Sequence, residues 1–236
     1  MRYWGPVRLA GVAAAALVVA CGGTTSSGDN GEPGKDAKTI LADSVAAMRS
    51  ARSAHMAGDI TTSDAHVLLN IDIAGKDAIS GTFTIDGTPV RITTSGGNSY
   101  LAGRALWNKV DPSGKAGELF GERCVLVPPT FPGAASILSG ISQISDLNGL
   151  ADSLSKPKGT VSKGSITSTG GSPAITIKDS ESTLYVATQG RPYPLRVEMS
   201  GSDGGHLDFA YNRRITVAPP ADCLDVSKLG VPPPPG

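Results

Sequence analysis

Length, composition and charge limit the classes of protein to which this chain can belong. It has 236 residues, of which 39% are hydrophobic and 5% aromatic, and its 21 basic side chains balance 21 acidic ones. This balance excludes the basic surface that nucleic-acid binding requires, so we expect no nucleic-acid partner. Abundant Gly, Ser and Thr and recurrent turn signals favour a β-rich architecture over a helical bundle.

The first 20 residues predict a lipoprotein signal peptide. Arg2 and Arg8 supply positive charge, and the uncharged run 9–20 is shorter than the ~20 apolar residues that a membrane span needs. The letters VVAC, ending at Cys21, resemble a bacterial lipobox, in which the cysteine thiol receives a diacylglyceryl group and becomes the mature N-terminus. The alternative is an ordinary cleavage site with an incidental cysteine.

The signal peptide is followed by segments of different character. Residues 21–35 contain the lipidated cysteine and a Gly/Ser/Thr-rich stretch without large apolar side chains, so we expect a flexible tether there. Residues 36–228 suit one domain with a sizeable core. Residues 229–236 form a proline-rich tail.

The three cysteines predict one disulfide. With Cys21 acylated, Cys124 and Cys223 remain as an even pair in an oxidising compartment outside the cytoplasm. A bond between them would close a loop worth on the order of 4–5 kcal/mol in the chain-entropy model. A catalytic or metal-binding thiol is the rival interpretation, disfavoured because neither cysteine has a second Cys or a His at ligand spacing.

The N-terminal half of the domain predicts one helix and then strands. Asp36 can cap a helix in which Leu41, Val45 and Met48 recur at helical spacing. From about residue 55 the apolar period becomes two, and the turn at residues 86–87 (Asp-Gly) indicates a hairpin. The stretch NSYLAGRALWNKV predicts another hairpin around Gly103, which completes a meander of five or six antiparallel strands.

The middle of the domain changes pattern and then returns to strands. In residues 130–156 apolar side chains recur every three or four positions, interrupted by Gly140 and Gly149, which predicts two or three short amphipathic helices. Four alternating segments follow: SPAITIKDS, STLYVATQG, YPLRVEMSG and HLDFAYN. The fold class is therefore α+β.

We expect a highly curved antiparallel sheet of about ten strands, a half-barrel, because a sheet of that size rarely stays flat. A few short helices would cover its concave face around an apolar cavity. A sheet with a filled core is the alternative. Trp107 is expected in the core or the cavity wall, and the alternative for it is a position at the mouth of the cavity. The side chains that we expect to line the cavity are Ile137, Ile141, Ile144, Leu147, Leu150, Leu154, Val67, Leu69, Ile71, Phe83, Ile85 and Trp107.

The lipobox, the single starting helix, the WNKV strand and the stretches TLYVATQGRPYPLRVEMSG and LDFAYNRRITVAPPADC resemble the LppX/LprG type of mycobacterial lipoproteins. The resemblance covers about residues 37–227 and is most specific in residues 184–220. It implies a half-barrel similar to the LolA and LolB carriers, and a role in binding or moving acylated lipids or glycolipids.

These observations predict a monomeric lipoprotein anchored on the extracytoplasmic face of the cell membrane, with membrane lipids as ligands and an envelope transporter as a candidate partner. An interaction module with a filled core that binds an envelope protein is the alternative from another class.

An ester hydrolase is the third hypothesis. The sequence lacks the G-x-S-x-G, H-E-x-x-H and phosphate-loop motifs, and Ser153 and Lys156 form an isolated S-x-x-K. The histidines are scattered in strand-like contexts: His55, His66 and His206. We therefore expect no catalytic residues, metal or cofactor.

Overall fold

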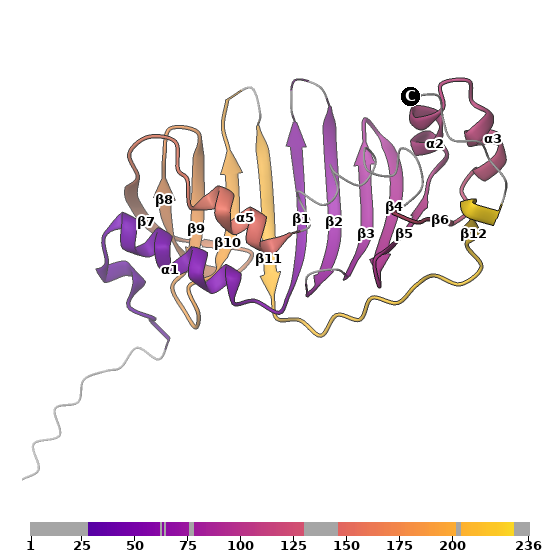
Figure 1. The fold of residues 1–236 in the computed structure, drawn as a ribbon. Coiled ribbons are helices and arrows are strands. Elements are labelled where there is room, and N and C mark those ends of the chain that lie inside the picture. Colours follow the sequence, from indigo (N-terminus) through magenta and orange to yellow (C-terminus); the bar gives the residue numbers. More distant parts are fainter. Residues whose placement is uncertain are drawn as a thin grey trace, which may run out of the picture.

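The computed structural model describes residues 28–61, 63, 65–75, 78–129, 146–201 and 204–228, and these residues build one sheet with helices on one side of it (Figure 1). The sheet has twelve strands in the order β12-β6-β5-β4-β3-β2-β1-β11-β10-β9-β8-β7. All neighbours are antiparallel except β12 and β6. The expected α+β fold with a curled antiparallel sheet is confirmed, with twelve strands in place of about ten.

The strands are β1 (Ser53–Thr61), β2 (His66–Ala74), β3 (Ala78–Ile85), β4 (Thr88–Ser95), β5 (Asn98–Ala102), β6 (Val125–Val127), β7 (Ser162–Thr169), β8 (Ser172–Lys178), β9 (Ser182–Ala187), β10 (Pro194–Met199), β11 (Gly205–Tyr211) and β12 (Leu224–Asp225). The described α-helices are α1 (Ala37–Arg49), α2 (Arg104–Val110), α3 (Lys115–Phe120) and α5 (Leu147–Leu154). Two short 3₁₀ helices are η1 (Glu32–Gly34) and η2 (Val226–Lys228). None of these helices is long and apolar enough to cross a membrane.

The first and last long strands meet in the middle of the sheet, because β1 pairs with β11 on one side and with β2 on the other. A Cβ added to Gly58 would overlap the carbonyl oxygen of His206, and one added to Gly81 would overlap that of Asn70. Glycine at these strand positions permits the close approach of neighbouring backbones.

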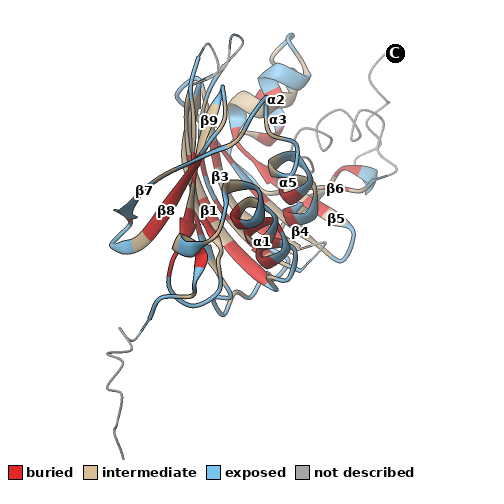
Figure 2. Cartoon of the chain, turned by 90° about the vertical axis from the view of Figure 1, so that its left-hand side faces the viewer, coloured by how far each residue is buried: buried red, intermediate tan, exposed pale blue. Residues whose placement is uncertain are grey.

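Helix α1 begins where its sequence predicts. The carboxylate of Asp36 accepts hydrogen bonds from the backbone N–H groups of Lys38 and Thr39, both 3.0 Å long, and so caps the helix. Ile40 and Met48 are fully buried against the sheet. Figure 2 shows α1 and α5 side by side over the inner face of the sheet.

The hairpin between β3 and β4 is also confirmed. Asp86 and Gly87 have φ angles of 50° and 80°, the left-handed conformation that a two-residue hairpin turn requires. Four inner side chains of these strands are buried: Ile79, Phe83, Val90 and Ile92.

The hairpin predicted around Gly103 is wrong. β5 ends at Ala102, and residues 104–110, which include the WNKV stretch, form helix α2. Its first residues, Arg-Ala-Leu, have high helix propensity, and α2 packs against α3. Trp107 consequently contacts Phe120 of α3, with ring centroids 5.0 Å apart.

The predicted boundary between tether and domain also needs correction. Asn30 is held against the turn between β9 and β10, because its backbone N–H donates to Thr188 (2.9 Å) and its side chain donates to Ala187 (2.9 Å). The Lys163 ammonium donates to the carbonyl oxygens of Pro33 and Lys35. The described chain is therefore ordered against the sheet before residue 36. The signal peptide, Cys21 and the tail from residue 229 lie outside the described residues.

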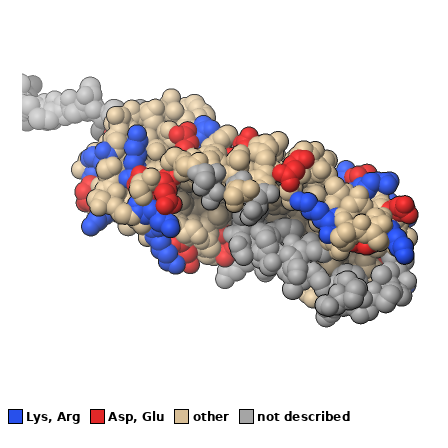
Figure 3. Space-filling model, turned by 90° about the horizontal axis from the view of Figure 1, so that it is seen from above, with Lys and Arg blue, Asp and Glu red and all other residues tan. Residues whose placement is uncertain are grey.

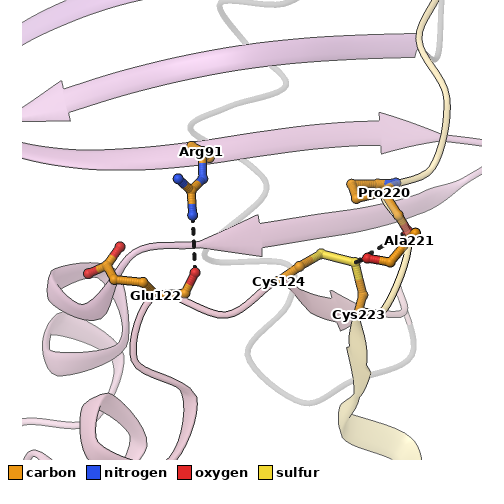
Figure 4. The surroundings of a disulfide bond; sticks show 6 residues. All are labelled: Arg91, Glu122, Cys124, Pro220, Ala221 and Cys223. Atoms are coloured by element: carbon orange, nitrogen blue, oxygen red, sulfur yellow. Dashed lines mark hydrogen bonds between the residues drawn. A yellow bond between two sulfur atoms is a disulfide. The ribbon is translucent and has the colours of Figure 1, made fainter.

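The predicted disulfide is confirmed. Cys124 precedes β6 and Cys223 precedes β12, and the bond joins them with their Cα atoms 4.6 Å apart (Figure 4). Residues 212–223 run along the lower edge of the sheet to reach this end (Figure 1). The bond fixes the C-terminal segment to the edge opposite β7.

Candidate functional site

A pocket of about 420 Å³ lies between the sheet and the two helices α1 and α5, and we call it the α1–α5 pocket. Its floor is the inner face of β8 to β11, and its walls are helix residues and the segment 156–161. The apolar side chains of the floor are Ile177, Leu184, Val197, Met199, Leu207 and Phe209. Its volume falls within the ~300–1,000 Å³ typical of small-molecule sites.

The floor residues form part of one row that crosses the sheet. Strand pairing places eight inner positions side by side from β8 to β4: Ile177, Leu184, Val197, Leu207, Gly58, Leu69, Phe83 and Val90. The four residues before Gly58 line the pocket. Leu69 and Phe83, beyond it, are buried in the core.

The helices that form the walls of the pocket are fixed by a cap and by an ion pair. Asp146 caps α5 by accepting from the backbone N–H of Asn148 (3.0 Å). Arg49 at the end of α1 pairs with Asp152 of α5. The apolar side chains of Leu41, Leu150 and Leu154 form this part of the pocket wall.

The rim of the pocket is polar and organised by one carboxylate. Asp179 accepts backbone hydrogen bonds from Glu181 (2.9 Å), Ser182 (2.6 Å) and Lys158 (2.8 Å). Partial burial raises the pKa of Asp179, but these N–H groups outweigh that effect, so the pKa lies below its ordinary value. The ionised carboxylate thus connects the β8–β9 turn to the wall segment.

The predicted cavity residues fall into three groups. Leu150 and Leu154 line the α1–α5 pocket. Ile137, Ile141 and Ile144 lie outside the described residues. The remaining seven do not line this pocket. They are buried in the core or partly buried, and their role as cavity walls stays a prediction: Leu147, Val67, Leu69, Ile71, Phe83, Ile85 and Trp107.

Sequence reasoning missed most of the pocket floor. Alternation in STLYVATQG and YPLRVEMSG already placed Leu184 and Val197 on one face of their strands. No sequence signal told which half of the sheet α1 would cover.

The isolated S-x-x-K pair has no activated serine in this structure. The Ser153 hydroxyl donates to the carbonyl oxygen of Gly149, 3.0 Å away, one turn earlier in α5. Both Ser153 and Lys156 line the pocket, and no hydrogen bond joins them among the described residues. A hydroxyl engaged in this way lacks the adjacent base that nucleophilic catalysis requires.

The histidines lie on the outer face of the sheet, opposite the pocket. His55 pairs with Asp72 (Nδ1 to Oδ1, 2.9 Å), and His66 pairs with Asp59 (Nε2 to Oδ1, 2.6 Å). His206 lies 3.5 Å from a carboxylate oxygen of its strand neighbour Asp208. Across the described ranges, no group of three His, Cys, Asp or Glu side chains is arranged to hold a metal ion.

Comparison with solved structures relates this architecture to two mycobacterial proteins. LprF from Mycobacterium bovis superposes with a TM-score of 0.59 at 12% identity, over 82% of this chain and 99% of that one. The lipoprotein LppX from Mycobacterium tuberculosis gives 0.52 at 14% identity, over 77% and 98%. The chain has the LprF and LppX fold. No protein-family model and no curated protein sequence matches it.

The superpositions thus cover about four fifths of this chain and nearly all of each of the two mycobacterial structures. At 12% and 14% identity, the likeness lies in the sheet and the helices over it, so the chemistry of the site rests on the residues of this chain.

Proposed function

We propose that the chain is a membrane-anchored lipoprotein that binds acylated lipids or glycolipids in the α1–α5 pocket and assists their transport or placement in the cell envelope. The observation that carries the proposal is the apolar floor of that pocket, built by Leu184, Val197 and Phe209 within the LprF and LppX fold.

The energetics favour a binding role without a chemical step. Each methylene withdrawn from water contributes ~0.8 kcal/mol, so exposing a 16-carbon chain costs on the order of 13 kcal/mol. An apolar pocket removes most of this barrier, and transfer between membrane and protein becomes nearly neutral. The direction of transfer then depends on the source and the acceptor.

The predicted anchor and the ordered N-terminal residues set the distance to the membrane. If Cys21 carries lipid, the chain between it and the fixed Asn30 is short. Even fully extended, the nine residue steps from Cys21 to Asn30 span at most roughly 30 Å. The proposal therefore places the β9–β10 turn, which binds Asn30, close to the bilayer.

Lipid uptake by the mature chain tests the proposal. Native mass spectrometry followed by organic extraction should recover bound lipid, and a fluorescent acyl lipid should load to a defined end point. Met199→Trp, which fills the pocket from β10, should lower that end point. Thr183→Trp, on the outer face of β9, is the matched control and should load like the parent.

Failure of the parent chain to take up any acyl lipid would refute the proposal. Equal loading by Met199→Trp and Thr183→Trp would instead remove the α1–α5 pocket as the site.

A further inference from the structure

A second hollow lies on the outside of α1, and we call it the α1 groove. It measures about 490 Å³ and runs between α1 and residues 155–161. The helix residues that line it recur every three or four positions along one face: Lys38, Leu41, Ala42, Val45 and Arg49. From first to last they cover roughly 16 Å of helix, at ~1.5 Å per residue.

The groove and the α1–α5 pocket share a wall. Leu41, Pro157 and Val161 line both, and each of them is half-buried. These three side chains are therefore a partition between an outer and an inner apolar space.

Of the partition residues, Val161 belongs to the segment with the fewest hydrogen bonds among the described residues. Lys158 is fixed by its N–H to Asp179 (2.8 Å) and by its carbonyl oxygen, which accepts from Ser180. The structure gives residues 159–161 no comparable hydrogen bond within the described chain, and Gly159 adopts a left-handed φ of 79°. Val161 can shift while the turn at Asp179 stays in place.

The groove has positive charge and no acidic lining residue. Arg49 at one end is paired with Asp152, whereas Lys38 at the other end has no ion-pair partner among the described residues. The rim of the inner pocket differs, since lysines and carboxylates occur there in equal number. Lys and Arg side chains lie at both ends of the molecule, with Asp and Glu among them, so the charge of the groove is a local property of its own lining (Figure 3).

We infer that the α1 groove is a second lipid subsite, which takes an acylated lipid with an anionic headgroup. Lys38 binds the headgroup, and the acyl chain lies on Leu41 and Val161 before it passes the partition into the α1–α5 pocket. This inference rests on the proposed function, because it assumes that the inner pocket holds acyl chains.

Stopped-flow uptake from phosphatidylcholine vesicles tests the groove. The two donors are phosphatidic acid and diacylglycerol with the same fluorescent acyl chain. Ala42→Trp fills the groove from an exposed position of α1, and Ala46→Trp is the control, exposed on the same helix and outside both hollows. Ala42→Trp should slow uptake of both lipids by about tenfold, because the indole ring occupies the entry route, and a barrier higher by about 1.4 kcal/mol gives this factor. End-point loading should match the parent.

Two further variants separate the groove from local damage and from charge. Thr160→Trp, on the opposite wall, should slow uptake as Ala42→Trp does. Lys38→Glu should reduce the preference for phosphatidic acid over diacylglycerol by about two- to five-fold, as expected for an exposed ion pair. Lys115→Glu on α3, also exposed, should leave the preference unchanged.

Uptake by Ala42→Trp and Thr160→Trp at the rate of Ala46→Trp would overturn the groove as a subsite, even while Met199→Trp still lowers end-point loading. An unchanged headgroup preference in Lys38→Glu would overturn the anionic assignment. A parent chain that takes up neither lipid would refute both the inference and the proposed function.

Discussion

The two ends of the sheet are covered by helices in different ways. Over β8 to β11, α1 and α5 present aliphatic side chains and leave the α1–α5 pocket. Next to β4, α2 and α3 bring Trp107 and Phe120 together in the core, and the disulfide closes this end. The inner strand residues are similar in both halves, so the covering helices decide whether space remains.

This comparison separates stability from binding within one domain. Rigid packing and a covalent bond stabilise the disulfide end, while the pocket end keeps unfilled volume. Interiors without voids are the more stable arrangement, so a retained pocket is a feature that binding explains and stability does not.

The largest effect should come from removing the disulfide. Changing both Cys124 and Cys223 to Ser should lower the free energy of unfolding by about 4–5 kcal/mol, because the unfolded chain regains the entropy of a closed loop of this length. Urea denaturation measures the change. Lipid uptake below the unfolding transition should persist, and its loss there would show that the two ends are not separable.

A matched pair of phenylalanines compares the packing of the two ends. Phe120 and Phe209 are each 7% exposed, but Phe120 packs on Trp107 whereas Phe209 borders the pocket. Phe120→Ala should destabilise by about 3–5 kcal/mol, because it opens a new cavity. Phe209→Ala should lower the free energy of unfolding by about 1.5–3 kcal/mol, because only the free energy of withdrawing the side chain from water is lost.

Lipid loading gives the second readout of this pair. Phe209→Ala enlarges the pocket and should load at least as much lipid as the parent. Equal destabilisation by the two substitutions would contradict the difference in packing between the ends.

The alternation of apolar and polar residues predicted many of the strands of this fold. Alternation placed Leu69, Ile71 and Phe83 on an inner face, and all three are buried. It failed for SKGSITST, which forms the edge strand β7, because an edge strand with few apolar residues shows little alternation. It also failed at α2, where a short apolar run fits either period.

The pocket could be predicted only in part, because it depends on tertiary contacts. Helical spacing identified Leu150 and Leu154, which do line it. The position of α1 over β8 to β11 depends on contacts far apart in the chain, including the pair of Arg49 and Asp152. Local sequence carries no record of such a contact.

The boundary between the halves can be altered at Gly58. A side chain there would overlap the β11 backbone and force β1 and β11 apart. Gly58→Ala should lower the free energy of unfolding by about 1–3 kcal/mol, the usual cost of overpacking. Gly34→Ala, where a Cβ meets nothing within 4 Å, should leave stability nearly unchanged. Similar denaturation midpoints for the two variants would argue against a constrained boundary.

The smallest expected effect is the pH dependence of the pocket rim. The pKa of Asp179 is below its ordinary value in the folded chain, so its carboxylate stabilises the fold above the unfolded pKa of ~3.9, and this stabilisation is lost as pH falls through the folded pKa. Asp179→Asn keeps an oxygen for Ser182 but replaces the oxygen that accepts from Lys158. Its thermal midpoint should therefore fall less than the parent's between pH 6 and 3, with a difference below about 2 °C.

Amide exchange locates that small effect. Asp179→Asn should speed exchange at Lys158, because its N–H loses the carboxylate acceptor, and should speed lipid uptake if the following residues form the partition. Asp111→Asn is the control, because the pKa of Asp111 is lowered by hydrogen bonds from Ser113 and Ala116 at the start of α3. It should alter the pH dependence and leave exchange at Lys158 unchanged. Equal exchange at Lys158 in both variants would mean that Asp179 does not anchor the wall of the pocket.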